Sequence, residues 1–65
     1  MTDKIIIYGI YQHYKGNQYE VLNLARHSET LEEMVVYKAL YGDFAIWTRP
    51  LNLFLQKFVL LEKAE

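Results

Sequence analysis

The sequence has no cysteine, one proline, three glycines and no long run of apolar residues. The lack of cysteine excludes disulfides, thiol catalysis and cysteine-based zinc sites. No stretch reaches the roughly 18 apolar residues of a membrane span, and Ile5–Ile7 is too short for a signal-peptide core. Because a small secreted domain without disulfides would be unusual, we expect a cytoplasmic protein with no membrane association.

An excess of charge of one sign is also lacking. Seven Lys and Arg residues against eight Asp and Glu residues give a net charge of −1. A dedicated nucleic-acid binder usually carries a basic excess that neutralises phosphates. The charge balance therefore argues against that role, although it leaves a local basic patch open.

Apolar residues, by contrast, are plentiful for the size of the chain. Sixty-five residues make one domain, residues 1–65, in which 52% of residues are hydrophobic and 15% aromatic. A domain this small buries only about 60% of its unfolded surface. Some apolar surface should stay exposed, and a partner or a second copy of the chain would cover it. A homodimer is therefore expected, with Phe54, Phe58 and Leu60 as the residues that cover an edge or a sister subunit.

The first part of the chain is typical of a β-hairpin. Residues 8–14 and 18–26 are rich in tyrosine, isoleucine and valine, which favour strands. Lys15-Gly16-Asn17 separates them, and Gly16 and Asn17 tolerate the positive φ that tight turns need. The polar segment that follows is interpreted as a solvated loop.

Two further strands are predicted at residues 34–41 and 44–48, separated by the turn signal Gly42-Asp43. Pro50 should end the second of them. Residues 51–62 are ambiguous, because Leu51, Phe54, Leu55 and Phe58 fit a helical stripe while Phe54, Phe58 and Val59 also suit a strand. We favour a turn at residues 51–53 followed by a fifth strand.

Five short strands in this length predict a mainly β fold, a small antiparallel SH3-like barrel that hides its own edges. The alternative is a β-sheet with a C-terminal helix.

Several short motifs also resemble those of one bacterial family. HYKG (13–16), YEV (19–21), ARHSET (25–30), VVY (35–37), LYGD (40–43), Trp47 and RPL (49–51) follow one another as in the family called domain of unknown function 1653. The resemblance covers most of the chain without gaps. It implies a small cytoplasmic bacterial domain with an SH3-like barrel and no established activity, and it supplies no catalytic residues.

The polar loop contains the residues most suggestive of chemistry. His27-Ser28-Glu29 places an imidazole, a hydroxyl and a carboxylate side by side. A nucleophilic triad needs such groups to converge from different elements, whereas consecutive side chains diverge. Neither His27 and Glu29 nor His13 and Asp43 have a metal-ligand spacing. We therefore expect no cofactor, no metal and no enzymatic activity, and an enzyme with a His27/Glu29 site is the third hypothesis.

The stronger candidate site is aromatic. Trp47 and Arg49 share one strand face because side chains alternate. A three-residue loop at Gly42–Phe44 would pair Tyr37 with Arg49 and put Tyr41 on the same face. A two-residue loop would instead place Trp47 opposite Lys38, because a shift of one residue reverses every face.

These residues lead to a functional hypothesis. Trp, Tyr and Arg dominate binding hot spots, so we predict a non-enzymatic interaction domain that recognises a protein or peptide. The predicted surface contains Trp47, Arg49, Tyr41 and Tyr37, with His27 and Glu29 on the adjoining loop. The simpler alternative places Trp47 in the core with Arg49 stacked on it.

Single-stranded nucleic acid is the second functional hypothesis. In that case tyrosines would stack on bases and basic side chains would contact phosphates. The residues proposed for it are Tyr11, Tyr14, Tyr19, Lys15, Arg26 and Lys38.

Overall fold

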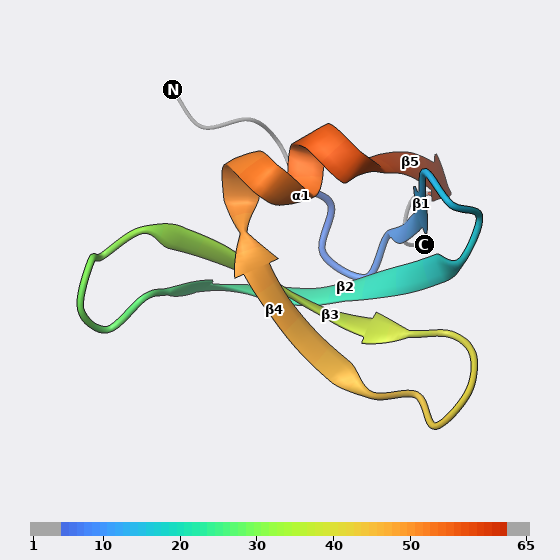
Figure 1. The fold of residues 1–65 in the computed structure, drawn as a ribbon, viewed down its shortest axis with the longest axis horizontal. Helices are drawn as coiled ribbons and strands as arrows, with labels where there is room; N and C mark the ends of the chain where they lie inside the picture. The colour runs from blue at the N-terminus through green and yellow to red at the C-terminus, as the bar shows by residue number, and fades with distance from the viewer. Residues whose placement is uncertain (1–4, 63–65) are drawn as a thin grey trace.

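The computed structural model describes residues 5–62. Along the chain the elements are β1 (Ile10–His13), β2 (Gln18–Arg26), β3 (Glu33–Ala39), β4 (Ile46–Pro50), α1 (Leu51–Lys57) and β5 (Phe58–Glu62) (Figure 1). The seven residues of α1, the helix among the described residues, are too few to cross a membrane.

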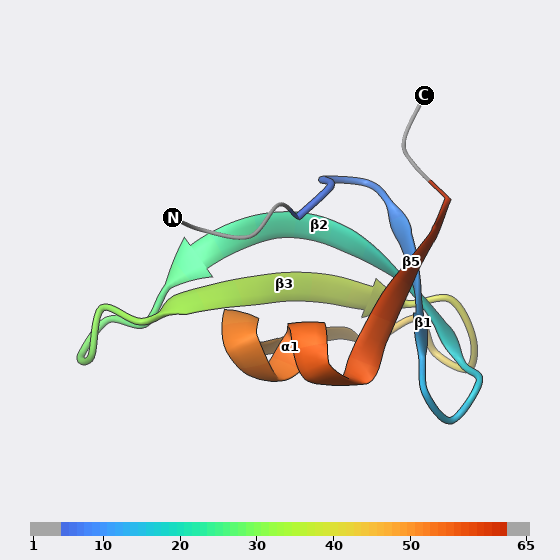
Figure 2. The ribbon, with the colours of Figure 1, turned by 90° about the horizontal axis from the view of Figure 1, so that it is seen from above.

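The strands form one antiparallel sheet in the order β4-β3-β2-β1-β5. The β2–β3 pairing shifts between Val21 and Asn23, which is a β-bulge. Bulges bend a strand and increase its twist, and Figure 2 shows β2 arching over β3, with α1 on the inner side of the arch. The mainly β fold with five antiparallel strands is confirmed.

Closure of this sheet into a barrel is the part of the fold prediction that needs correction. β4 and β5 are the two edges of the sheet and do not pair with each other. The connection between them is α1, which packs on the inner face of the sheet and buries Phe54 there.

The C-terminal segment contains both the predicted fifth strand and the helix that was its alternative. The helix takes the place of the expected turn at residues 51–53, and the strand follows it. The helical stripe turns Phe54 into the core, where the side chain is fully buried. Phe58 caps the helix with extended backbone angles and begins β5. Its ring stacks on that of Phe54 with centroids 4.1 Å apart, which joins the helix to the strand.

The core lies between the inner face of the sheet and α1. Its buried members are Tyr11, Tyr19, Val21, Val35, Tyr37, Ala39, Phe54 and Phe58. Five of these eight residues are aromatic, and Phe54 meets both Tyr11 and Tyr37 at 5.2 Å between centroids. Such ring pairs stabilise by about 0.5–1.5 kcal/mol beyond the burial of their area.

Strand boundaries differ from the predicted ones mainly where the backbone turns. Tyr8 has φ 67° and Phe44 has φ 57°. Both therefore lie in turns, and their strands begin two residues later than predicted, at Ile10 and Ile46. The turn between β1 and β2 is confirmed, with Gly16 at φ 109°.

Candidate binding site

The geometry of the site follows from the β3–β4 register. Tyr37 lies opposite Trp47 and Val35 opposite Arg49, and the Ala39 N–H donates to the Ala45 carbonyl at 2.9 Å. Both predicted registers are therefore wrong. The observed register differs by two residues from the register that a three-residue loop would give. A shift of two residues keeps every side chain on the same face of the sheet. Tyr37, Trp47 and Arg49 consequently share a face.

The loop between β3 and β4 spans residues 40–44 and is longer than either predicted loop because of the conformation of its backbone. Gly42 and Phe44 both have positive φ, 59° and 57°. The Phe44 N–H donates to the Tyr41 carbonyl at 3.0 Å, which closes a turn inside the loop. A sequence pattern does not reveal that Phe44, rather than a second glycine, adopts this conformation.

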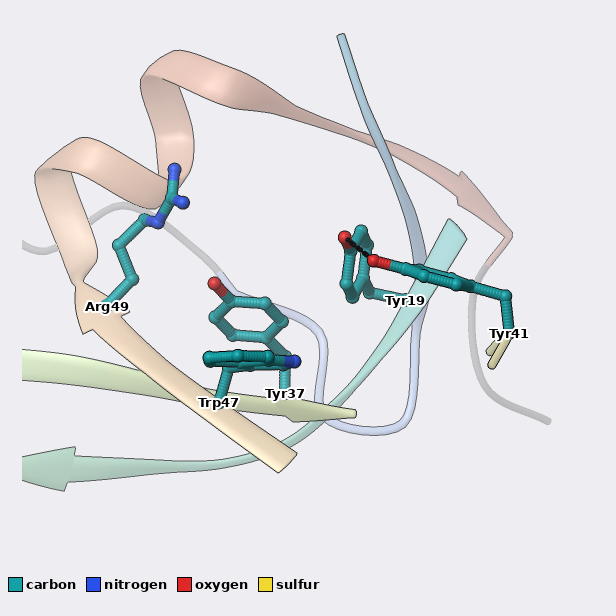
Figure 3. Close-up of a pocket in the computed structure, with 5 residues that line it drawn as sticks. All are labelled: Tyr19, Tyr37, Tyr41, Trp47 and Arg49. Atoms are coloured by element: carbon teal, nitrogen blue, oxygen red, sulfur yellow. Dashed lines mark hydrogen bonds between the residues drawn. The ribbon is translucent and has the colours of Figure 1, made fainter. Parts of the chain in front are cut away.

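These side chains enclose a hollow of about 220 Å³, which we call the aromatic hollow. Its lining is Tyr19, Tyr37, Tyr41, Trp47 and Arg49 (Figure 3). Tyr19 and Tyr37 are buried core residues that form its floor, whereas Tyr41 is 43% and Trp47 55% exposed. Trp47 is thus a surface wall and not part of the core.

The tyrosines of the aromatic hollow hold one another in place. The hydroxyls of Tyr19 and Tyr41 are 2.7 Å apart and share a hydrogen bond (Figure 3). The Tyr19 ring meets that of Tyr37 edge-on, with centroids 5.3 Å apart. Burial, assisted by the hydrogen bond with Tyr41, raises the pKa of Tyr19 to about 12. The Tyr19 hydroxyl is therefore neutral across the physiological range.

Arg49 supplies the charge of the aromatic hollow. Its guanidinium carbon lies 5.4 Å from the centre of the Phe58 ring, so the aromatic partner of Arg49 is Phe58 and not Trp47, the partner in the simpler alternative. Among residues 5–62 no carboxylate pairs with Arg49, and the ion pair found there joins Lys38 Nζ to Glu20 Oε1 at 3.9 Å. Both of those residues belong to the opposite face of the sheet, because each alternates with a buried neighbour.

Three more basic side chains gather beside Arg49, and we call His13, Lys15, Arg49 and Lys57 the basic cluster. The His13 ring packs edge-on against Phe58, with centroids 4.9 Å apart. Lys15 and Lys57 place their Nζ atoms 5.8 and 5.1 Å from the Tyr14 ring centre. Burial lowers the pKa of His13, and the positive charges of Arg49, Lys15 and Lys57 lower it further.

Sequence reasoning missed His13 and Lys57 as neighbours of Arg49. They are far apart in the chain, on β1 and at the end of α1, and meet because β1 pairs with β5. The Tyr14 N–H donates to the Lys57 carbonyl at 2.9 Å, which ties the two segments together. No local pattern signals such a contact.

His27 and Glu29 do not line the aromatic hollow, so the structure does not bring them to the predicted surface. His27 Nδ1 accepts hydrogen bonds from the backbone N–H groups of Glu29 and Thr30, at 3.1 and 3.3 Å. The Thr30 hydroxyl accepts from the Glu32 N–H at 3.3 Å. These side chains order the β2–β3 loop, which is the role that short polar side chains often have in loops.

A second hollow, of about 230 Å³, lies near that loop, and we call it the acidic hollow. Glu32, Glu33, Leu51 and Asn52 line it. Within residues 5–62, no three His, Cys, Asp or Glu side chains gather as a metal site would require.

The residues proposed for nucleic acid are not assembled on one surface. Tyr11 and Tyr19 are buried, so their faces are closed to bases. Lys38 pairs with Glu20. Tyr14 is exposed and lies beside Lys15, so these two of the proposed residues are neighbours on the surface.

Fold and site define a small, mainly β domain with an open five-stranded sheet and an aromatic hollow beside a basic cluster. The chain belongs to the family described as "Protein of unknown function (DUF1653)", whose profile matches residues 9–64. The crystal structure of a DUF1653 protein from Bordetella bronchiseptica is similar, with 33% sequence identity, a TM-score of 0.76 and 88% of each chain covered. Among curated proteins no match was found. The family resemblance noted in the sequence is thereby confirmed.

Proposed function

We propose that the domain is a non-enzymatic binding module that recognises a protein or peptide through the aromatic hollow. The observation that carries the proposal is Trp47, more than half exposed, beside an Arg49 that has no carboxylate partner among residues 5–62. Exposure of the apolar tryptophan side chain to water is unfavourable, and burial of that side chain against a partner would be favourable. Tryptophan, tyrosine and arginine are also the residues that dominate binding energy in interfaces.

Preorganisation supports the same proposal. Trp47 and Arg49 stand on β4, and Tyr19 and Tyr37 stand on paired strands below them. The shared hydrogen bond of Tyr19 and Tyr41 joins the rings at 2.7 Å. Side chains that are already ordered lose less conformational entropy when a partner binds.

The test compares two neighbours on β4 that point to opposite faces. Trp47→Ala should weaken the binding of a partner captured by the wild-type chain by about tenfold or more, as expected of a hot-spot residue. Ile46→Ala is the matched control, because Ile46 is 62% exposed but does not line the aromatic hollow. Calorimetry with the purified partner measures both. Equal affinities for the two variants would overturn the proposal.

Single-stranded nucleic acid is the second candidate, and Tyr14 favours it. Both Lys15 and Lys57 place their Nζ atoms near this exposed ring, which is the combination of stacking surface and positive charge that unpaired bases and phosphates require. Salt-dependent retention on single-stranded DNA, lost in Tyr14→Ala, would support this candidate over the first.

A homodimer in the cytoplasm is also proposed, and it is supported by the lack of cysteine and by exposed apolar residues on β5. Phe54 and Phe58 cannot cover a partner because they are buried. Val59, Leu60 and Leu61 are exposed apolar residues of that edge strand. Sedimentation equilibrium at micromolar concentration should give a dimer mass, and a monomer mass across the range would contradict it.

A further inference from the structure

We infer that the aromatic hollow takes an acidic peptide segment in which a carboxylate lies next to an apolar side chain. This inference rests on the proposed function and specifies the chemistry of its partner. The carboxylate would be bound by Arg49 and the apolar side chain by the rings of Trp47 and Tyr41.

The distribution of charge supports an anionic partner. The basic cluster places three of the cationic side chains and His13 on one side of the molecule. No carboxylate lines the aromatic hollow. Glu20 pairs with Lys38, and Glu32 and Glu33 line the acidic hollow at the other end of β3. A cationic partner would be repelled here although aromatic walls usually favour cations.

The contacts of Arg49 point to a carboxylate in particular. Its guanidinium packs against the Phe58 ring and makes no hydrogen bond or ion pair within residues 5–62. The guanidinium N–H groups that find no acceptor there can bind a planar, two-oxygen acceptor in a bidentate way. Carboxylates match that geometry.

The rings supply the apolar half of the site. Trp47 and Tyr41 form exposed walls above the buried Tyr37 and Tyr19. In Figure 3 the aromatic side chains of Trp47 and Tyr37 stand on one side of the hollow and those of Tyr19 and Tyr41 on the other, with Arg49 towards α1. A hollow of about 220 Å³ has room for one side chain and its neighbouring charge.

A nucleic-acid strand fits these observations less well. A strand needs a basic groove that follows its backbone, whereas the cations here form one compact cluster. Two of the tyrosines that bases would need, Tyr11 and Tyr19, are buried. The overall charge of −1 adds no general attraction for phosphates.

The experiment uses the single tryptophan of the chain, because its one indole N–H signal in an NMR spectrum reports on the aromatic hollow alone. The probes are the tetrapeptide acetyl-Gly-Phe-Glu-Gly-amide, its Glu→Gln counterpart of the same shape, and an eight-nucleotide oligothymidylate. Each is titrated into the full chain at about 50 mM salt and again at about 500 mM salt.

The acidic tetrapeptide should shift the Trp47 signal with an affinity about tenfold higher than the Gln tetrapeptide, as a charge-assisted bond provides. High salt should shrink this preference. Arg49→Gln should abolish this preference, so that the two tetrapeptides bind the variant with equal affinity. Arg26→Gln, a substitution of the same type outside the aromatic hollow, should alter neither affinity.

Equal affinities for the two tetrapeptides, or no shift with either, would overturn the inference. Tighter binding of the oligothymidylate at the Trp47 signal would overturn it in favour of nucleic acid. The proposed function is judged separately, by loss of a captured partner in Trp47→Ala. If that loss occurs while the tetrapeptides bind equally, the binding module stands and only its acidic preference falls.

Discussion

The aromatic hollow and the acidic hollow lie at opposite ends of β3, and they are built differently. Glu32 and Glu33 stand where β3 begins, and Tyr41 follows shortly after it ends (Figure 1). The aromatic side chains that line the aromatic hollow pack directly against the rings of the core. The side chains of the acidic hollow come from the end of the β2–β3 loop, the start of β3 and the first turn of α1. The rings of the first surface are therefore held by contacts with one another, whereas the glutamates of the second stand beside a loop that is ordered by a few hydrogen bonds.

The largest expected effect tests whether the aromatic hollow depends on the core beneath it. Phe54→Ala removes a fully buried ring that contacts Phe58 and Tyr37, so the free energy of unfolding should fall by about 3–5 kcal/mol. Leu53→Ala, in the same helix but exposed, should change it by less than about 0.5 kcal/mol. Urea denaturation measures both. A similar small change in the two variants would show that the core does not support the hollow.

A smaller effect concerns the hydroxyl pair of the aromatic hollow. Tyr41→Phe removes the hydrogen bond with the part-buried Tyr19 hydroxyl, which should cost about 0.5–1.5 kcal/mol. Tyr14→Phe is the control, because Tyr14 is exposed. Thermal unfolding followed by circular dichroism compares them, and equal midpoints would mean that the ring contacts alone position Tyr41.

At the acidic end the prediction concerns loop order. His27→Ala removes the acceptor for the Glu29 and Thr30 N–H groups, and we expect a loss of about 0.5–1 kcal/mol because the loop is exposed. Hydrogen exchange at those two amides should accelerate while the Trp47 indole signal stays in place. Ser28→Ala is the control. A displaced Trp47 signal would show that the two ends are coupled.

The smallest expected effect is a pH dependence. The pKa of His13 is lowered from its ordinary value of 6.5 by burial and by the cations around it. The unfolded state then binds the proton more readily, so stability should fall as the pH drops below about 6.5 and level off below the folded pKa. His13→Gln should lose this part of the pH dependence. Urea midpoints at pH 5 and pH 7.5 test it, and parallel changes in wild type and variant would exclude His13 as the cause.

Several features were predictable from the sequence because they depend on near neighbours. β2 has its predicted bounds, Gln18–Arg26, because β-forming residues and the Gly16 turn are local signals. The shared face of Trp47 and Arg49 followed from alternation alone. The helical stripe at Leu51, Phe54, Leu55 and Phe58 was also visible, although the pattern suited a strand as well.

Other features depend on contacts between distant segments, and the tertiary structure alone decided them. The β3–β4 register rests on the left-handed backbone of Gly42 and Phe44, for which Phe44 carries no sequence signal. The choice of helix after Pro50 rests on burial of Phe54 against the sheet, since propensity alone is weak over so few residues. The meeting of His13 and Arg49 around Phe58 requires β1 to pair with β5, and local preferences contain no information about which distant strands become neighbours.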